Sequence, residues 1–287
     1  MSPEALLRFE GLEVVFDDGE QRTEAVRGLD LVIHPGEVVA LVGESGSGKS
    51  VSVMSAMRLL EGTAATYPAG RILWRGEDVL GMDRVRLHRL RGHEMGIVFQ
   101  EPMTALNPLH TCGDQVAEAL LLHTELDAAA RRARVVDLFR QVHLAEPERR
   151  VDQYPHELSG GMRQRVCIAM ALACDPALLI ADEPTTALDV TVQAQILDLL
   201  RELQDQRDMA VLFITHDLGV VADIADRVVI MWQGRPVESG SVIDIFERPQ
   251  HPYTRGLLAC RPSLQRIARR GHRRERLPTV ADFTTGD

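Results

Sequence analysis

This chain of 287 residues contains a single lysine, at position 49, beside 31 arginines. The residues around it are Gly43, Glu44, Ser45, Gly46, Ser47, Gly48, Lys49 and Ser50. Glycines let successive backbone N–H groups converge on an anion, and a compact ammonium group on a flexible stem suits such a tight loop better than a planar guanidinium does. The segment fits the pattern G-x-x-x-x-G-K-[ST] of a phosphate-binding loop (P-loop). In that pattern Lys49 reaches the β- and γ-phosphates of a nucleotide, and the Ser50 hydroxyl holds Mg²⁺.

The segments on either side of this loop are those that a P-loop requires. Residues 38–42 form a short apolar run with β-branched side chains, typical of a buried parallel strand, and residues 50–60 are predicted to form a helix. The positive end of that helix's dipole would then face the phosphates. A glycine-rich turn without a ligand is the alternative, but the order of strand, loop, lysine and helix favours a nucleotide site.

Two acidic residues follow a second apolar run. Residues 178–181 are predicted to be a strand, and Asp182 and Glu183 come directly after it. Beside the phosphates, the first carboxylate can hold Mg²⁺ or a water bound to it, and the second can polarise the attacking water. We therefore expect Asp182 to be a metal ligand and Glu183 to be the general base. The alternative is that the two acids cap the start of a helix.

A third segment has the residue types of an anion site. Ser159, Gly160 and Gly161 open a predicted helix, where free N–H groups and a serine hydroxyl are available to an anion. One chain rarely needs two cradles for the same γ-phosphate. If this segment faces the P-loop of another subunit, ATP becomes the contact that holds two protomers together.

The elements that must position these residues alternate between strands and helices, which predicts a mainly parallel central sheet. The predicted strands are residues 12–16, 29–33, 38–42, 71–74, 97–99, 178–181, 211–215 and 228–232. Residues 107–173 differ, because they contain three predicted helices (114–123, 128–142 and 160–173) and no convincing strand. We interpret this region as an α-helical insertion.

Composition limits the classes of function. With 45% apolar residues the chain can bury a sizeable core, as one large domain or as a domain with an insertion. The net charge of −10 argues against a general nucleic-acid-binding protein, which needs a basic face. Residues 261–287 carry seven arginines and a local charge of +4, and we interpret them as a solvated tail.

Two further features concern the compartment. The chain has no run of 18 uncharged apolar residues, and residues 1–10 lack the basic and apolar regions of a secretory signal, so we expect neither a membrane span nor secretion. The four cysteines do not form a C-x-x-C pair, which favours free thiols in a reducing compartment. They are Cys112, Cys167, Cys174 and Cys260.

Taken in order, the motifs in residues 6–260 resemble those of the ABC ATPases. The three segments described above resemble the Walker A motif, the Walker B motif and the signature sequence, with Met162 where many members have glutamine. The resemblance implies an α/β fold with a P-loop NTPase core, a mainly parallel central sheet, an antiparallel β subdomain and an α-helical insertion. It implies a nucleotide-binding domain over residues 1–240, with the helical insertion at about 104–174, and a C-terminal extension over 241–287 whose basic tail begins at 261.

The same resemblance assigns four more residues. Gln100 is similar to the Q-loop glutamine that senses Mg²⁺ and touches the membrane subunits, Asp189 to the D-loop aspartate and His216 to the switch histidine. Phe16 falls where the family places an aromatic ring on adenine. Plain alternatives are a strand-end amide for Gln100, a core imidazole for His216 and a core aromatic for Phe16.

The resemblance also implies a mechanism. ATP and Mg²⁺ bound by one protomer, through Lys49, Ser50, Asp182 and Gln100, are closed over by Ser159 and Gly161 of another protomer. His216 holds the γ-phosphate and Glu183 activates water. Hydrolysis reopens the interface and drives attached membrane subunits between two arrangements.

More narrowly, four stretches resemble the oligopeptide/dipeptide importer group, which also takes up nickel, opines and some glycosides, and the form of the signature resembles its first-type ATPase subunit. These stretches are residues 25–28, 44–47, 100–108 and 251–258. The implied partners are a second, different ATPase subunit, two transmembrane permeases and an extracytoplasmic solute-binding protein, at the cytoplasmic face of the cell membrane, with no nucleic acid. Because Cys260 stands alone, where many first-type subunits have a cysteine-rich segment, we expect no iron–sulfur cluster. Residues 276–280 resemble a junction found before that segment or before a second fused ATPase half, which suggests a natural chain or a shortened relative. Rival interpretations are a soluble ABC ATPase of DNA repair or translation, and a regulatory module that binds ATP without hydrolysing it.

Overall fold

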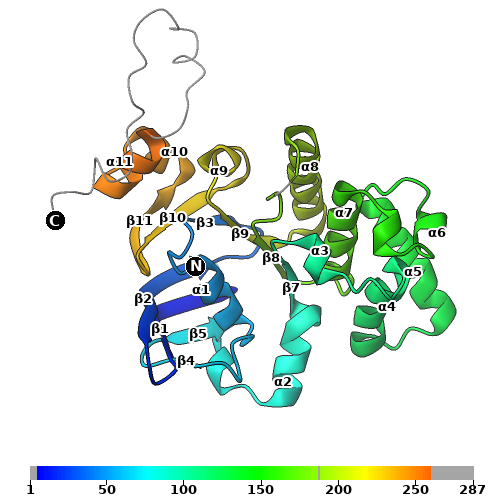
Figure 1. The fold of residues 1–287 in the computed structure, drawn as a ribbon, viewed down its shortest axis with the longest axis horizontal. Coiled ribbons are helices and arrows are strands. Elements are labelled where there is room, and N and C mark those ends of the chain that lie inside the picture. Colours follow the sequence, from blue (N-terminus) through cyan, green and yellow to red (C-terminus); the bar gives the residue numbers. More distant parts are fainter. Residues whose placement is uncertain (1–4, 187, 260–287) are drawn as a thin grey trace, which may run out of the picture.

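The computed structural model describes residues 5–186 and 188–259, apart from the side chain of Met103. Its centre is a six-stranded sheet in the order β11-β10-β3-β9-β8-β7 (Figure 1). The strands are β3 (Val38–Val42), β7 (Met95–Val98), β8 (Leu178–Asp182), β9 (Ala210–Thr215), β10 (Arg227–Trp232) and β11 (Arg235–Ser241). All neighbours pair in parallel except β10 and β11. Strands β3, β8 and β9 are buried along their whole length, which explains why they are continuous apolar runs.

A second, antiparallel sheet packs beside the first, in the order β2-β1-β5-β6 with β4 on β1. Its strands are β1 (Leu7–Asp17), β2 (Arg22–Ile33), β4 (Ala65–Thr66), β5 (Arg71–Trp74) and β6 (Glu77–Asp78). The prediction of an antiparallel β subdomain is confirmed. Strands β1 and β2 are longer than the predicted 12–16 and 29–33. In β1 the pairing register shifts between Phe9 and Leu12, where Gly11 has a left-handed φ of 54°. This bulge interrupts the alternating sequence pattern, so the first half of the strand was not predicted.

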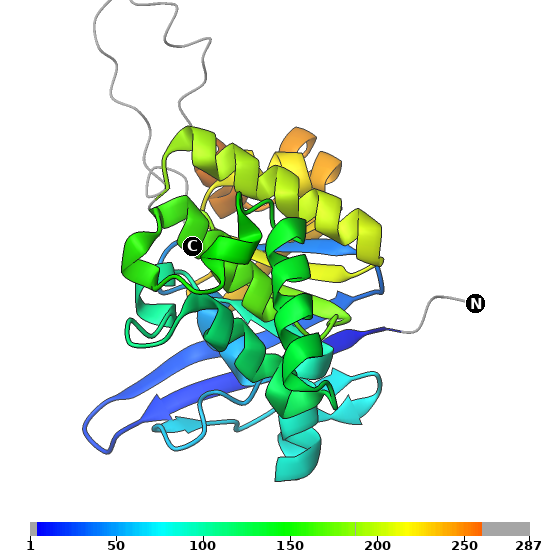
Figure 2. The same cartoon turned by 90° about the vertical axis from the view of Figure 1, so that its right-hand side faces the viewer.

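The helices lie around the central sheet and in one separate group. They are α1 (Lys49–Ala56), α2 (Arg84–Arg89), α3 (Pro102–Ala105), α4 (Cys112–His123), α5 (Ala128–Gln141), α6 (Pro147–Arg150), α7 (Gly160–Ala171), α8 (Val190–Arg207), α9 (Leu218–Ile224), α10 (Val242–Glu247) and α11 (Pro252–Ala259), with short turns at Val79–Gly81, Leu90–Glu94 and Pro155–Glu157. Helices α3 to α7 form a group beside the sheet, with no strand among residues 102–177 (Figures 1 and 2). The predicted helical insertion is therefore present. No helix among residues 5–186 and 188–259 combines the length and apolar character that crossing a membrane requires.

Two helix ends differ from the prediction. Helix α1 ends at Ala56 rather than at residue 60, because Arg58 adopts a left-handed φ of 49° and its guanidinium group donates to the carbonyl of Met82. Helix α7 ends at Ala171, two residues earlier than predicted, since Asp175 also takes a left-handed conformation that turns the chain toward β8.

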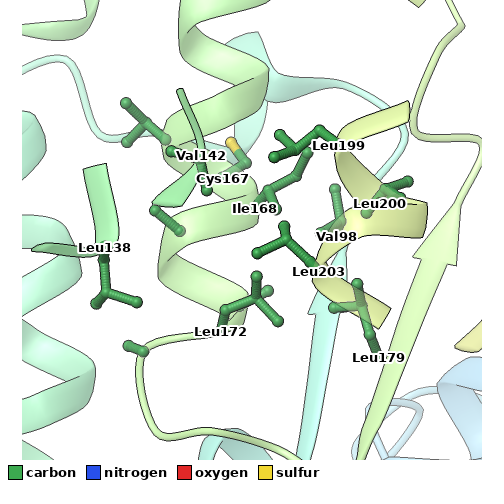
Figure 3. Close-up of a cluster of buried hydrophobic side chains, with 14 of the residues drawn as sticks. Val98, Leu138, Val142, Cys167, Ile168, Leu172, Leu179, Leu199, Leu200 and Leu203 are labelled. Atoms are coloured by element: carbon green, nitrogen blue, oxygen red, sulfur yellow. The ribbon is translucent and has the colours of Figure 1, made fainter. Parts of the chain in front are cut away.

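One apolar cluster attaches the helical insertion to the central sheet (Figure 3). Two residues of α7, Cys167 and Ile168, and Leu172 at its C-terminal end pack against α8. Their partners there are Leu199 and Leu203, and all five side chains are buried. Burying one such leucine or isoleucine stabilises a fold by about 1.5–3 kcal/mol. The insertion is thus held to the sheet by packing, so the signature segment at the start of α7 has a fixed place relative to the strands.

The three cysteines within the described residues are free and buried, as predicted, and Cys260 lies outside those residues. Burial raises the pKa of Cys112 to about 11, of Cys167 to about 12 and of Cys174 to about 11. Because the thiolate is the reactive form, we expect iodoacetamide at pH 8 to alkylate these three at least about 100-fold more slowly in the native protein than in the urea-unfolded protein. Peptide mass spectrometry over time measures this ratio, and rapid native labelling of Cys167 would contradict the packing shown in Figure 3.

Candidate active site

The loop that joins β3 to α1 requires glycine at two positions. A side chain at Gly48, whose φ is 98°, would place its Cβ 2.4 Å from the carbonyl oxygen of Ala25. A side chain at Gly43 would place its Cβ 2.2 Å from the carbonyl oxygen of Met231. Between them, Glu44 to Gly46 are exposed. The backbone of this loop is therefore closely packed on its inner side and open to solvent on its outer side, as a site for phosphates requires.

Lys49 is the first residue of α1, and its side chain is buried, with 5% exposed. Its Nζ donates to the carbonyl oxygens of Gly43 at 2.8 Å and Glu44 at 2.9 Å. Burial lowers the pKa of the ammonium group, and the charges of Glu183 and Asp182 oppose that shift. The loop thus curls around the one lysine of the chain.

Ser50 and Asp182 form the part of the site that suits a hard cation. The Ser50 hydroxyl donates to Oδ1 of Asp182 at 3.2 Å, and Asp182 is 4% exposed at the end of β8. Burial raises the pKa of Asp182, while the hydrogen bond from Ser50 lowers it. Mg²⁺ prefers oxygen ligands and binds through one or two protein groups together with phosphates and waters, so these two oxygens fit it. Among the described residues, no group of three or more His, Cys, Asp or Glu side chains could hold a metal without a nucleotide.

The Glu183 carboxylate lies at the meeting point of three strand ends. Its Oε2 accepts hydrogen bonds from Nε2 of Gln100 at 3.0 Å and from the hydroxyl of Thr186 at 2.9 Å. Its Oε1 is 3.2 Å from Nδ1 of His216. Gln100 follows β7 and His216 follows β9, the two neighbours of β8 in the sheet. Parallel strands bring these side chains together because their carboxyl ends lie at the same edge.

The backbone at Glu183 is in an unusual conformation. Its φ of 47° is left-handed, and its N–H donates to the carbonyl oxygen of Ile214 on β9 at 2.9 Å. Such a conformation in a residue other than glycine costs about 1–3 kcal/mol and is found preferentially at functional sites. The hydrogen bond across the sheet holds the residue in it, which turns the carboxylate toward Gln100 and His216.

Five predicted residues lie outside this constellation, and four of them belong to the signature segment and the start of α8. Ser159 caps α7 by accepting the N–H of Met162, and Asp189 caps α8 by accepting the N–H of Val192 at 3.0 Å. Ser159 and Gly160 are exposed, whereas a Cβ at Gly161 would lie 2.7 Å from Cγ1 of Val192. The signature segment therefore presents its serine, its first glycine and the start of α7 to solvent.

Phe16, the fifth, lies near the end of β1 in the antiparallel sheet, and its ring is not a free platform. Its half-buried ring packs against the core of the antiparallel sheet, with Thr23 and Ala65 as its strand partners. The interpretation of Phe16 as a core residue therefore accounts for the buried part of its ring, and the rest of the ring is exposed. Thr186 was not predicted as a site residue. The only feature of the sequence that indicates it is its position three residues after Glu183.

Phosphate-loop geometry between β3 and α1, with an acidic pair at the end of β8, defines a P-loop nucleotide hydrolase of the α/β class. The sequence profile described as "ABC transporter" matches residues 26–186, and the one described as "Oligopeptide/dipeptide transporter, C-terminal region" matches residues 237–286. The chain therefore belongs to the ABC transporter family, as an ATP-binding subunit that hydrolyses ATP. For this chain the assignment implies a dimeric ATPase with membrane permease subunits as partners.

Relatives and solved structures agree with this assignment. A "Putative peptide import ATP-binding protein" of Brucella ovis is 51% identical, over 100% of this chain and 86% of that protein. The oligopeptide transport ATP-binding protein OppD of Bacillus subtilis is 49% identical, over 91% of this chain and 73% of that protein. The dimeric, post-hydrolysis structure of the ATP-binding cassette MJ0796 with ADP and phosphate is 28% identical, with a TM-score of 0.73 over 82% of this chain and 98% of that one. The predicted fold class and family are confirmed.

Proposed function

We propose that this protein powers the uptake of peptides or similar small solutes through an ABC importer, at the cytoplasmic face of the membrane. The observation that carries the proposal is the Glu183 carboxylate, held by Gln100 and Thr186 beside the loop that surrounds Lys49. The substrate class follows from the match of residues 237–286 to the oligopeptide/dipeptide transporter region and from the names of the relatives. The same match favours transport over a soluble role in DNA repair or translation.

In the proposed mechanism, the backbone N–H groups of the P-loop and the Lys49 ammonium bind the phosphates of ATP. Ser50, Asp182 and the side-chain oxygen of Gln100 would hold Mg²⁺, which would supply positive charge to the phosphate oxygens when bound. Glu183 accepts a proton from the attacking water. The hydrogen bonds from Gln100 and Thr186 orient its carboxylate.

The exposed signature segment completes the site in a dimer. We infer that Ser159, Gly160 and Gly161 of one subunit bind the γ-phosphate held by the other subunit, with Asp189 at the same interface. His216, which is more than half exposed beside Glu183, holds the γ-phosphate from the first subunit. We also propose a nucleotide-binding domain over residues 1–240, with the helical insertion at about 104–174, followed by a C-terminal extension over residues 241–287. The second ATPase subunit differs from this chain, and an extracytoplasmic binding protein delivers the solute.

We propose that the contact with the permeases lies next to Gln100. An apolar pocket between β7 and the helical insertion is lined by Phe99, Ala105, Ala119 and Met170, among others. Phe99, at 39% exposed, is the neighbour of Gln100 in the chain. A permease segment in this pocket could therefore sense the position of the amide that contacts Glu183.

The test is transport by the complete assembly. Proteoliposomes that contain this subunit, its partner ATPase and both permeases should accumulate labelled peptides when ATP and Mg²⁺ are enclosed on the ATPase side and binding protein is added outside. The control is the same assembly with a non-hydrolysable ATP analogue, in which we expect no accumulation above background. Full ATPase activity without permeases, together with no ATP-dependent uptake of any peptide, would refute the proposal.

A further inference from the structure

The C-terminal extension reaches into the P-loop through one side chain. Tyr253 of α11 is fully buried, and its hydroxyl oxygen accepts a hydrogen bond from the backbone N–H of Glu44 at 3.2 Å, across 209 positions of sequence. Burial raises the pKa of this phenol to about 12, so the hydroxyl is neutral at physiological pH. Glu44 itself is exposed, and its amide is one of the N–H groups of the phosphate-binding loop.

The contact fixes the orientation of one peptide group. The carbonyl of Gly43 and the N–H of Glu44 belong to the same planar unit and point in opposite directions. The carbonyl accepts from Nζ of Lys49 at 2.8 Å, and the N–H donates to Tyr253. Rotation of this peptide plane would break both hydrogen bonds at once. The phenol and the lysine therefore hold the loop between them.

Tyr253 is itself held on three sides. Its backbone N–H donates to Nδ1 of His251 at 3.2 Å, and the N–H groups of Gln250 and His251 donate to the Glu238 carboxylate on β11 at 2.7 and 3.0 Å. Its ring stacks on Trp232 at the end of β10, with centroids 5.4 Å apart. The turn that follows Trp232 makes a second contact with the P-loop. In it, the N–H of Gly234 donates to the carbonyl of Ser47 at 3.1 Å.

We propose that Tyr253 is a positioning residue for ATP binding, which keeps the Gly43–Glu44 peptide in the orientation that surrounds Lys49 and so makes the C-terminal extension part of the nucleotide site. This inference rests on the proposed function of the P-loop. It goes beyond that function, because it assigns a role in the ATPase reaction to a segment outside the ATPase motifs. Without the phenol hydroxyl, the peptide rotates and only a fraction of molecules has the binding-competent loop, so the apparent affinity falls by that fraction.

The test uses Tyr253→Phe in the full chain, because phenylalanine keeps the ring on Trp232 and removes only the hydroxyl. We expect ATP to bind about tenfold more weakly, as the loss of one partly buried hydrogen bond implies. In the assembled transporter the KM for ATP should rise by a similar factor, while kcat at saturating ATP stays within about twofold, because the loop is fixed once ATP is bound. The matched control is Arg255→Ala, an exposed position on the same helix, which should leave both constants unchanged.

A second measurement does not depend on nucleotide. In ligand-free protein labelled with isotopic glutamate, the Glu44 amide should exchange with solvent at least about tenfold faster in Tyr253→Phe than in wild type, since that amide is no longer bonded. Faster exchange together with a raised KM supports the proposal. Unchanged exchange overturns it, and so does unchanged ATP affinity in a variant with the thermal stability of wild type. If wild-type protein did not bind ATP at all, the proposed function would fall, and the exchange measurement would still decide the role of Tyr253.

Discussion

Replacing Glu183 with glutamine should abolish steady-state ATP hydrolysis by the assembled transporter, by at least about 100-fold, and leave ATP binding intact. Glutamine has the shape of glutamate but cannot take a proton from water. The P-loop, Lys49 and Asp182 are unchanged, so the nucleotide still binds. In the proposed mechanism hydrolysis reopens the dimer, so the variant should accumulate as an ATP-bound dimer with its cognate partner. Phosphate release measures turnover, and size-exclusion chromatography with ATP measures the trapped dimer.

The matched control is Glu202→Gln, which makes the same chemical change at an exposed position of α8. Its activity should equal that of wild type. Undiminished ATPase activity in Glu183→Gln would refute the role of Glu183 as general base. Loss of activity together with loss of ATP binding would instead assign Glu183 a structural role, because its left-handed backbone and its contacts with Gln100 and Thr186 would then be needed for folding.

Two strands have the predicted bounds, for different reasons. Strand β3 is buried on both faces, so its apolar run ends where the strand ends. Strand β5 is buried only at alternate positions, so its alternating pattern of apolar residues marks it. Strand β11 was missed because it is an edge strand of mostly polar, partly exposed residues that pairs only with β10. An edge strand has one neighbour and one open side, so burial leaves little trace in its sequence.

In the candidate site, too, some features were predictable from local sequence patterns and others were not. Residue types and order were enough to select Lys49, Asp182 and Glu183, because a P-loop and a strand ending in acids are local patterns. Their geometry depends on the order of strands in the sheet, which places Gln100 and His216 on either side of Glu183. The contact from Tyr253 joins segments 209 positions apart, and nothing local in either segment indicates it.

Replacing Lys49 with arginine should weaken ATP binding by about 100-fold, the equivalent of roughly 2.7 kcal/mol, although the charge is kept. The Lys49 ammonium is nearly fully buried, between two carbonyl oxygens at 2.8 and 2.9 Å. A guanidinium group is larger and planar, so it cannot occupy that position without moving the Gly43–Glu44 peptide. Titration with a fluorescent ATP analogue measures the dissociation constant, and thermal unfolding without nucleotide shows whether the fold is kept.

The outcome distinguishes charge from shape as the reason for the single lysine. If charge alone mattered, Lys49→Arg would bind ATP as well as wild type and Lys49→Ala alone would lose it. If the tight loop requires a compact ammonium, both variants lose binding, and the reverse exchange Arg89→Lys at an exposed position has no effect. The chain uses arginine at its 31 other basic positions, so retention of lysine here favours the second outcome. Wild-type affinity in Lys49→Arg would show that the packing of the loop around Nζ does not determine nucleotide binding.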